Sequence, residues 1–482
     1  MLGFLALTIA SAQTKEPWED ESWFGTATYN LAAKGSLFND VLQGQGTWRE
    51  GMKRHFYWEP PLSFVVNAAA SRFFGFSLFT IRAVSIGFGA IAVLCAFVLS
   101  KKLTGSDEVS LLAMALVAFD YFFLVGSSDG RMDAMCMALG FGGVTAYFLW
   151  REISLPVAIL ISQSCVAASG ITHPNGIIWF AAIWLLIVGL DGRRLRLPLL
   201  ALAAVPYLVG ALGWGLFIAQ DPRDFRTQFL GNVGESSSAN QSSEHPLKHP
   251  ITAASDELTE RYIFPFGLGA GVDPLRRLKG LVLLIYAAAL TAALISRTMR
   301  RSTAVRVLFC LIAVSFLEMT FVMGDKMSCY LIHMTPLLAI LTAVVFASAM
   351  SRGFWARVAI LGLVSVMIIV QGGGLWFQIS RNTYRNVYLP AVGTIQAYSK
   401  PGDVVLGSSV FFWTLRGERR LTDDVRMGYY SHAQPELIVI SPFYRAIETH
   451  ARGTIGDYFQ RTLALYSPIP FQNEYEILKK KH

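Results

Sequence analysis

Two adjacent carboxylates, Asp20 and Glu21, lie in the stretch WEDESWFGTATYNLAAKG (residues 18–35), shortly after an apolar segment. A carboxylate near a membrane surface can act as a general base that deprotonates a hydroxyl or amine nucleophile. A structural interpretation is also available, because apolar residues at helical spacing follow and Gly35 can end the helix. Asp20 is then well placed as an N-cap, in a region that favours acids. The spacing leaves both interpretations open.

A second group of charges occupies SSDGRMDAM (residues 127–135), where Asp129, Arg131 and Asp133 share a very short loop. The planar guanidinium of Arg131 suits a phosphate, but it suits a neighbouring carboxylate equally well. Asp120 lies about two turns earlier, within an apolar segment. An acid at that depth is costly, so a functional role is predicted for it.

The stretch HFYWEPPLSF (residues 55–64) carries Glu59 before two prolines that can start an amphipathic segment, and its aromatic residues suit a membrane interface. Arg82 stands at the start of the next apolar segment. Its side chain could snorkel to lipid headgroups or could hold a lipid phosphate.

Further polar residues lie in other short loops. His173 follows one apolar segment, and Lys326 and Tyr330 follow a later one. A lone histidine is usually structural, but with acids nearby it could bind a metal or a phosphate. The chain has no glycine-rich nucleotide loop of the Rossmann or Walker type and no HExxH motif.

The elements that must position these residues are membrane helices. The chain has 482 residues, of which 53% are hydrophobic and only 15% are charged, whereas a soluble chain carries about 25% charged residues. Ten apolar segments are long enough, or nearly so, to span a bilayer. They lie at 78–100, 109–126, 133–150, 154–171, 174–190, 198–219, 278–296, 303–323, 329–350 and 356–376. The stretch MLGFLALTIASAQ is a poor signal peptide, and we interpret it as a short or truncated first span. About eleven transmembrane helices are therefore predicted.

Basic residues alternate between the loops. One set of loops is rich in Lys and Arg (101–102, 151, 193–196, 297–306 and 352–357), whereas the other set is poor in them. The positive-inside rule places the basic set in the cytoplasm. The loops 14–77 and 220–277 and the C-terminal tail then lie outside. We interpret the net charge of +8 as a topology signal and expect no nucleic-acid partner.

The tail differs in character from the rest of the chain. DVVLGSSV and ELIVISP resemble buried strands followed by turns, and IQAYSK and IGDYFQRTLALY resemble helices. The predicted fold class is an all-α polytopic membrane protein (residues 1–376) with a small extracytoplasmic α/β domain (residues 377–482). The five cysteines have no paired spacing, so neither a disulfide framework nor a zinc–cysteine site is expected.

Several of these motifs, taken in order, resemble a known family. They are DESWFGTATYNLA, EPPLSFVVNAA, FGFSLFTIRAVS, GRMDAM and KMSCYLIHMTPLLAIL. The pattern is similar to that of integral-membrane GT-C glycosyltransferases, above all the protein O-mannosyltransferases and the bacterial transferase that adds aminoarabinose to lipid A. The resemblance covers residues 18–180 and returns at 326–341.

The resemblance implies inverting transfer of a sugar from a polyprenyl-phosphate donor to a lipid, glycan or protein acceptor, in contact with membrane lipids. Asp20 matches the family's catalytic acid, and Glu21 is its neighbour. Arg131 and Asp133 fall in the loop that borders the site. Lys326, with Tyr330 close by, matches a basic residue near the lipid phosphate.

One departure affects the predicted ligands. The aminoarabinose enzymes carry Glu-Lys before the two prolines, but this chain has Trp58 and Glu59 there. Glu59 is therefore predicted to meet the acceptor or, with His173, a divalent metal ion. Some relatives use a divalent ion and others use none, so the resemblance leaves open whether a divalent metal ion is the cofactor. Arg82 is a further candidate for holding the donor phosphate.

Two other function classes compete with the transferase. A transporter or lipid flippase also has about eleven spans and intramembrane acids, but it usually shows repeated halves and a site at the bilayer midplane. A tethering protein would not need Asp20, Arg131 and Lys326 on one face. The gathering of polar residues on the outer side favours an enzyme. The interpretation that follows is a bacterial inner-membrane protein whose active site faces the periplasm or exterior.

Overall fold

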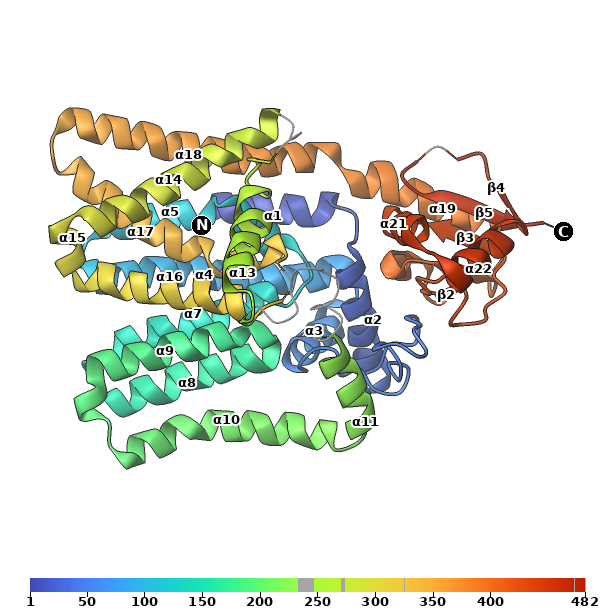
Figure 1. Ribbon diagram of the computed structural model, residues 1–482, viewed down its shortest axis with the longest axis horizontal. Coiled ribbons are helices and arrows are strands. Elements are labelled where there is room, and N and C mark those ends of the chain that lie inside the picture. The colour runs from blue at the N-terminus through green and yellow to red at the C-terminus, as the bar shows by residue number, and fades with distance from the viewer. Residues whose placement is uncertain (233–246, 270–273, 325, 472, 482) are drawn as a thin grey trace. The chain divides into compact units, whose positions relative to one another are not determined.

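The computed structural model describes residues 1–232, 247–269, 274–324, 326–471 and 473–481 (Figure 1). It divides the chain into two compact units, each built from separate segments. Unit 1 comprises 1–11, 83–216 and 233–378, and unit 2 comprises 12–82, 217–232 and 379–482. The sequence suggested one division, near residue 376. The structure instead groups two earlier segments with the C-terminal tail.

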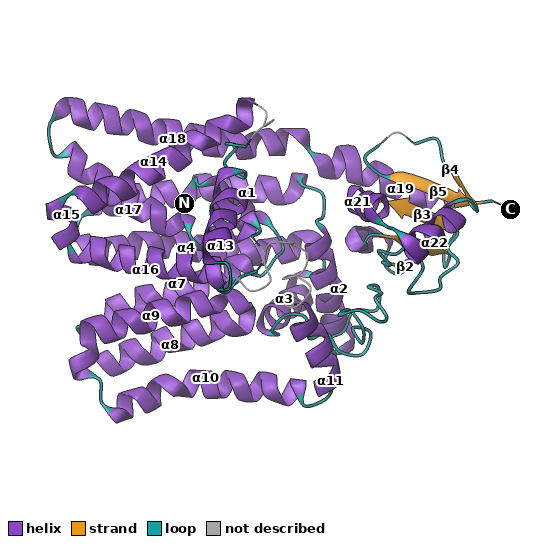
Figure 2. Ribbon diagram, viewed as in Figure 1, coloured by secondary structure: helices purple, strands orange, loops and turns teal. Residues whose placement is uncertain are grey.

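The helices of the apolar region account for most of unit 1 (Figure 2). They are α1 (Leu2–Thr14), α4 (Leu78–Thr104), α5 (Asp107–Ala118), α6 (Tyr121–Ser128), α7 (Asp133–Trp150), α8 (Leu155–Thr172), α9 (Ile177–Asp191), α10 (Leu197–Ile218), α13 (Pro250–Asp256), α14 (Pro274–Ile295), α15 (Arg297–Arg301), α16 (Thr303–Phe321), α17 (Thr335–Met350) and α18 (Phe354–Arg381). Short 3-10 or π turns join some of them: η1 (Pro174–Gly176), η4 (Glu257–Ile263) and η5 (Ser328–His333).

Seven of the described helical segments are long and apolar enough to cross a membrane, and an eighth span is formed if a bent pair counts as one. All seven correspond to predicted segments. Their main helices are α4, α8, α9, α10, α14, α16 and α18. The predicted span at 109–126 is that bent pair, α5 and α6, which meet at 59°. The predicted span at 329–350 is shorter than expected, because η5 precedes a 16-residue α17. The protein is an integral membrane protein, but the count of eleven helices is not confirmed.

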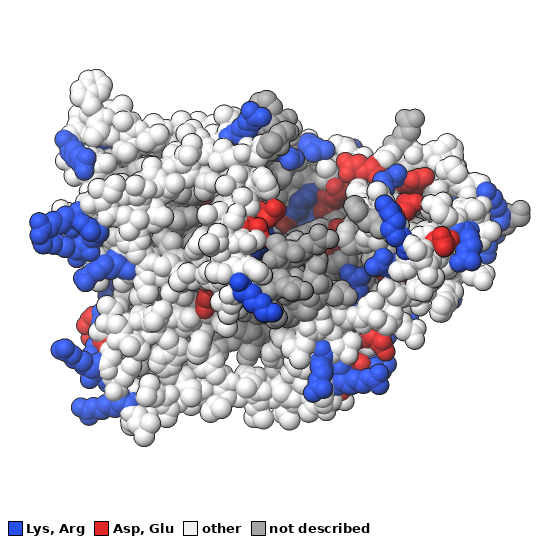
Figure 3. Space-filling model, viewed as in Figure 1, with Lys and Arg blue, Asp and Glu red and all other residues white. Residues whose placement is uncertain are grey.

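Basic side chains gather at one end of unit 1. They lie around α15 and around the turns from α9 to α10 and from α17 to α18 (Figures 1 and 3). These are the loops that the sequence assigned to the cytoplasm. Their common position is what an alternating topology requires.

Unit 2 contains the juxtamembrane helices and the sheet. Its elements are α2 (Glu19–Lys34), α3 (Leu62–Phe74), α11 (Pro222–Phe225), α19 (Leu389–Tyr398), α20 (Phe412–Leu415), α21 (Pro442–His450), α22 (Gly453–Leu463) and the strands β1 (Val404–Gly407), β2 (Arg420–Thr422), β3 (Leu437–Ile440), β4 (Tyr466–Pro468) and β5 (Glu476–Lys480). The helix and strands predicted in the tail are confirmed at 404–407, 437–440 and 453–463.

The sheet has the order β2-β1-β3-β5-β4, in which β1 is parallel to β2 and β3, and β5 is antiparallel to β3 and β4. Alternate residues face opposite sides. Val405 packs in a core with α19, while its neighbour Leu406 packs in a second core with residues of α21 and α22. The tail is therefore a sheet covered by helices on both faces.

A buried carboxylate joins α2 to this sheet. Asp423, which is fully buried, accepts hydrogen bonds from the indole of Trp23 (2.8 Å), the backbone N–H of Ser409 (2.8 Å) and the hydroxyl of Tyr444 (2.7 Å). Because each donor comes from a different element, Asp423 fixes the orientation of α2 within unit 2.

Candidate active site

The first candidate region is the beginning of α2. The helix starts at Glu19 with Trp18 as its N-cap, so the prediction that Asp20 is the N-cap is wrong. Asp20 instead occupies the second helical position, where the helix dipole still favours a carboxylate. Its side chain is partly exposed, whereas that of Glu21 is fully buried. Gly35 ends the helix in the left-handed conformation, as predicted.

Glu21 is held by a buried ion pair. The Nε and Nη2 atoms of Arg82 donate to Oε1 and Oε2 of Glu21 at 2.8 and 2.6 Å, and both side chains are fully buried. Oε2 of Glu21 also accepts the N–H of Trp18 at 2.9 Å. Glu21 thus satisfies an otherwise unpaired amide of the first helical turn while it binds the guanidinium.

Arg82 has no N–H left for a phosphate. Its three remaining donors reach the backbone carbonyls of Ala12, Lys15 and Glu16 at 2.7–2.9 Å, so all five guanidinium hydrogens are used. The predicted snorkelling and phosphate contact are therefore corrected. The side chain lies in the interior and positions Glu21 and the segment before α2.

Asp120 also has a structural explanation. It stands at the break between α5 and α6, where Oδ1 accepts the N–H of Phe123 and Oδ2 accepts the hydroxyl of Tyr286, both at 3.0 Å. The acid that the sequence singled out as functional therefore caps a bent helix pair.

The second candidate region is in unit 1, at the start of α7. Nε of Arg131 donates to Oδ2 of Asp133 at 2.7 Å, and both residues are buried. Burial alone would lower the pKa of Arg131, but the adjacent carboxylate raises it above its ordinary value. Oδ1 of Asp133 is buried and has no hydrogen-bond partner among the residues that the structure describes. This pair therefore keeps one strong acceptor unused.

The ring of Tyr330 links several residues of this region. Arg131 and Arg261 lie 6.0 and 5.8 Å from its centroid, and the ring of His173 lies 5.7 Å away. Cations over an aromatic face are held by its quadrupole. Of these four residues, Arg261 was not predicted from the sequence. Its one signal was the i, i+4 pair with Glu257, a spacing that more often marks a solvated helix face.

His173 is neutral in this setting. Burial lowers its pKa to about 4, although Asp133 acts in the opposite direction. Its Nδ1 accepts the N–H of Asn175 at 3.1 Å, so Nε2 carries the proton. His333 has the same tautomer, since Nδ1 accepts from Trp179 at 3.3 Å, and its Nε2 has no partner in the described part of the chain. The region therefore presents uncharged N–H donors beside a carboxylate.

Lys326 is engaged with the end of α16. Its ammonium lies 2.8–2.9 Å from the carbonyls of Met319, Thr320 and Met323 and 3.2 Å from Oε2 of Glu257. Three hydrogens on three terminal carbonyls make an effective C-terminal cap. Burial lowers the pKa of Lys326. A contact with phosphate stays a prediction, and it would require the ammonium to leave these carbonyls.

The predicted metal ligands Glu59 and His173 are both buried. Among the described residues, one group of three His, Cys, Asp or Glu side chains has its ligand atoms within 4.8 Å of one another, and neither Glu59 nor His173 belongs to it. A metal on these two residues stays a prediction.

Comparisons with known proteins now identify the fold. A family model described as dolichyl-phosphate-mannose-protein mannosyltransferase matches residues 32–191. The structure is similar to ArnT from Cupriavidus metallidurans bound to undecaprenyl phosphate, with a TM-score of 0.63 and 13% identity over 98% of this chain and 96% of that one. The chain has the GT-C fold. A comparison with curated protein sequences finds no match.

A second GT-C structure supports the assignment. AglB, the archaeal oligosaccharyltransferase from Archaeoglobus fulgidus in complex with an inhibitory peptide and a dolichol-phosphate, is similar with a TM-score of 0.54 and 12% identity over 97% of this chain and 72% of that one. The family match includes Glu59, Arg82, Arg131, Asp133 and His173 but begins after Asp20 and Glu21. The family match therefore does not rest on these two carboxylates.

Proposed function

We propose that the protein is an inverting glycosyltransferase that moves a sugar from a polyprenyl-phosphate donor to a lipid, glycan or protein acceptor at the outer face of the membrane. The observation that carries the proposal is the contrast between Asp20 and Glu21. One carboxylate of the pair is locked in a buried ion pair, and its neighbour on the same rigid helix remains partly exposed. The GT-C fold and the mannosyltransferase family match support the donor class.

In this proposal Asp20 is the general base. It removes the proton from an acceptor hydroxyl or amine as that group attacks the anomeric carbon. The bond from this carbon to the phosphate oxygen breaks, polyprenyl phosphate leaves with the electron pair, and the configuration inverts. Glu21 and Arg82 are positioning residues, because their buried contacts hold the first turn of α2.

The unit 1 residues are assigned to the donor. Arg131 is proposed to stabilise the phosphate charge that develops as the bond breaks, with Lys326 as a second cation. Asp133 Oδ1 and His333 Nε2 are a buried acceptor and a buried donor that have no hydrogen-bond partner within the described ranges of the chain. Groups of both kinds suit the hydroxyls of a sugar. The ring of Tyr330 lies beside Arg131 and Arg261 and is proposed to help hold these two guanidinium groups in place.

The outer-face location in a bacterial inner membrane belongs to the same proposal. It rests on the alternation of basic loops, which places residues 377–482 outside the cytoplasm. Reporter enzymes fused after residue 482 test it. A reporter that requires export should be active, and activity of a cytoplasm-only reporter would overturn the topology.

The substrate class is tested by deleting the gene and analysing cell-envelope lipids by mass spectrometry. The proposal predicts that an unused polyprenyl-phosphate sugar accumulates while one glycan, lipid or protein modification disappears. An unchanged lipid and glycan profile would contradict a transferase. Loss of transport of a lipid-linked sugar, with normal transfer in membrane fragments, would favour the alternative of a flippase.

The base is tested with the donor identified in that way and purified protein in nanodiscs. Asp20→Asn is nearly isosteric and keeps a polar group on α2, but it cannot take the proton, so transfer should fall about a hundredfold or more. Glu19→Gln is the matched control, because it removes a charge from the adjacent position of the same turn. Near-normal turnover in Asp20→Asn would contradict Asp20 as the base and would direct the search to Asp129 or Asp133.

A further inference from the structure

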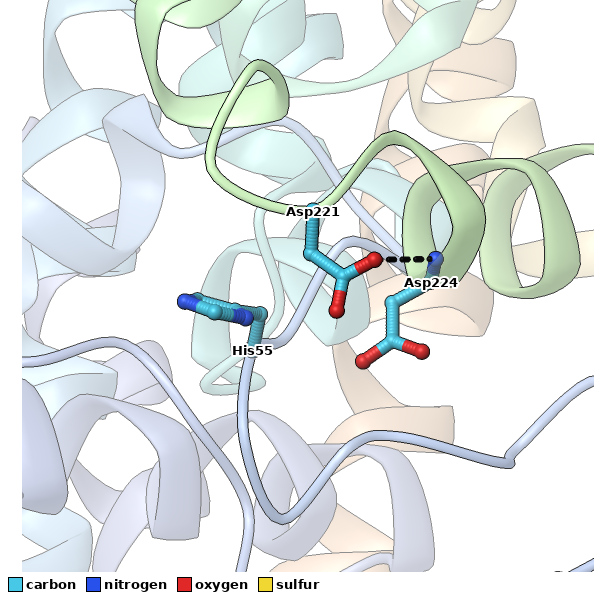
Figure 4. Close-up of side chains that lie close together, drawn as sticks. All are labelled: His55, Asp221 and Asp224. Carbon is cyan, nitrogen blue, oxygen red and sulfur yellow. Dashed lines mark hydrogen bonds between the residues drawn. The ribbon is translucent and has the colours of Figure 1, made fainter.

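Three side chains of unit 2 converge outside the regions discussed so far. His55 comes from the loop before α3, and Asp221 and Asp224 come from the N-cap and third residue of α11. Their nitrogen and oxygen ligand atoms all lie within 4.8 Å of one another. Figure 4 shows the imidazole and the two carboxylates facing a common space. Neither aspartate was predicted from the sequence to have a function.

Each carboxylate has one oxygen already in use and one directed elsewhere. Oδ1 of Asp221 accepts the N–H of Asp224 at 3.0 Å (Figure 4), and Oδ1 of Asp224 accepts from Nη2 of Arg54 at 2.7 Å. Oδ2 of Asp224 and Nδ1 of His55 are buried and have no hydrogen-bond partner in the described structure. Asp224 as a whole is only 3% exposed. A buried carboxylate oxygen without a donor is unfavourable unless a cation binds it.

The surrounding backbone fixes this arrangement. Gly51 has a positive φ of 85°, and a Cβ at this position would collide with the Asp224 carboxylate. The carbonyl of Gly51 accepts the N–H of His55 at 3.2 Å. The side-chain amide of Gln228 then donates to the carbonyl of His55 at 2.9 Å. Glycine is therefore required where the loop passes over the carboxylate, and His55 is anchored at both backbone groups.

Arg54 is the existing counter-charge. It lies 2.7 Å from Oδ1 of Asp224, but its Nε is 3.8 Å from Oδ2 of Asp221, too far for a hydrogen bond. Its side chain is 61% exposed, so it can turn into solvent at little cost. The two carboxylates carry two negative charges and Arg54 supplies one positive charge. The group therefore keeps a net negative charge that a second cation can neutralise.

We propose that His55, Asp221 and Asp224 bind a divalent transition-metal ion, with Zn²⁺ as the probe. One imidazole nitrogen and two carboxylate oxygens are a ligand set for such an ion, whereas Ca²⁺ and Mg²⁺ prefer oxygen alone. Zinc ligands bound at about 2.0–2.2 Å lie roughly 3.5 Å apart, so a small closing motion of the side chains completes the site. The ion would tie the loop before α3 to α11. This inference does not depend on the proposed transfer reaction.

The test measures metal binding by the full-length protein in detergent. Protein stripped with a chelator and dialysed against Zn²⁺ should retain one ion, counted by plasma mass spectrometry, and titration calorimetry should give its affinity. Asp224→Asn and His55→Gln should each weaken binding at least tenfold, because each removes a ligand. Asp221→Asn should do the same while keeping the α11 cap, since Asn caps as well as Asp.

Two further variants complete the design. Arg54→Gln should strengthen Zn²⁺ binding, the opposite sign from the ligand variants, because it removes the competing cation. His432→Gln changes an exposed histidine of the tail and should leave the affinity unchanged. Wild-type protein that binds no Zn²⁺, or that binds it as tightly as folded Asp224→Asn and His55→Gln proteins do, would overturn the site. Thermal unfolding of each variant confirms that it is folded.

Discussion

The pairs Glu21–Arg82 and Asp133–Arg131 are both buried arginine–carboxylate contacts, but they differ in what remains unused. Every guanidinium hydrogen of Arg82 has an acceptor, and both oxygens of Glu21 have donors. Asp133 uses Oδ2, whereas its Oδ1 has no hydrogen-bond partner in the part of the chain that the structure describes. A saturated pair can only hold the fold together. A pair with a buried polar atom left over has capacity to bind a ligand.

The largest expected effect comes from opening the saturated pair. Arg82→Gln should lower the free energy of unfolding by about 3–5 kcal/mol, because Glu21 is left as a buried charge without its cation. Arg72→Gln, on the exposed surface of α3, is the control and should change it by at most about 1 kcal/mol, because its hydrogen bond to the carbonyl of Ala32 is exposed to solvent. Thermal and denaturant unfolding in detergent measure both. A loss below about 1 kcal/mol for Arg82→Gln would show that the pair is not structural.

The next effect concerns the pair with an unused oxygen. The double variant Arg131→Gln with Asp133→Asn removes both charges, so neither is stranded, and the fold should survive. Donor binding should weaken by about 1.5–3 kcal/mol, the worth of a charged hydrogen bond. Calorimetric titration with the polyprenyl-phosphate sugar measures this loss, and Lys326→Met tests the second cation in the same way. Unchanged donor affinity in both proteins would contradict the proposal that the donor phosphate binds in this region.

The dependence of stability on pH should distinguish the two units. The unfolded chain protonates His173 near its ordinary pKa of 6.5, but the folded protein does so only near 4. Stability should therefore fall as the pH falls from 7 to 5, by about 2 kcal/mol from this residue. Replacement by Gln should remove that part of the slope.

Glu16, in unit 2, should act in the opposite direction. Burial first, and then Glu474, raise its pKa from 4.5 to about 7, so the folded protein keeps a proton that the unfolded chain loses. Its contribution to stability should fall as the pH rises from about 4.5 to 7. Glu16→Gln should therefore make the decline toward pH 5 steeper, and His173→Gln should make it shallower. Slopes that change in the same direction would contradict the assignment.

The smallest effect is expected for an exposed pair. Lys34 lies 3.2 Å from Asp40, with side chains 48% and 45% exposed. Lys34→Ala should change the free energy of unfolding by at most about 1 kcal/mol. A loss as large as that of Arg82→Gln would mean that burial does not explain the difference between the pairs.

Much of the fold was predictable because membrane spans and buried strands leave long apolar runs. The seven long helices and strands β1 and β3 follow directly from such runs. The break between α5 and α6 was not predicted, since hydropathy averages over a bend. Asp120 marked its position, but an acid within an apolar segment indicates a capped break and a functional group equally well. The assembly of unit 2 from three separate segments has no local signal.

The candidate site was predictable in part. Residue types in the short loops that are poor in Lys and Arg pointed to charges that prove to be buried, such as Arg131 and Asp133. The partners of Arg82 were not predictable, because this side chain donates hydrogen bonds to backbone carbonyls, which have no sequence signature. Asp221 and Asp224 were overlooked for a related reason. An aspartate before a proline commonly starts a helix, so its sequence gives no sign of a ligand. Gly51 and His55 come close to it only in the folded protein, where the proposed ligand group forms.

The acceptors of Arg82 have a consequence for biogenesis. All of them precede it in the chain, by 61 to 70 residues. Ribosomes deliver the N-terminal part first, so every group that neutralises this arginine already exists when α4 enters the membrane. The positive charge at the head of the first long span can be masked before any later helix is made. The assembly of the polytopic chain can therefore begin from a locally complete N-terminal nucleus.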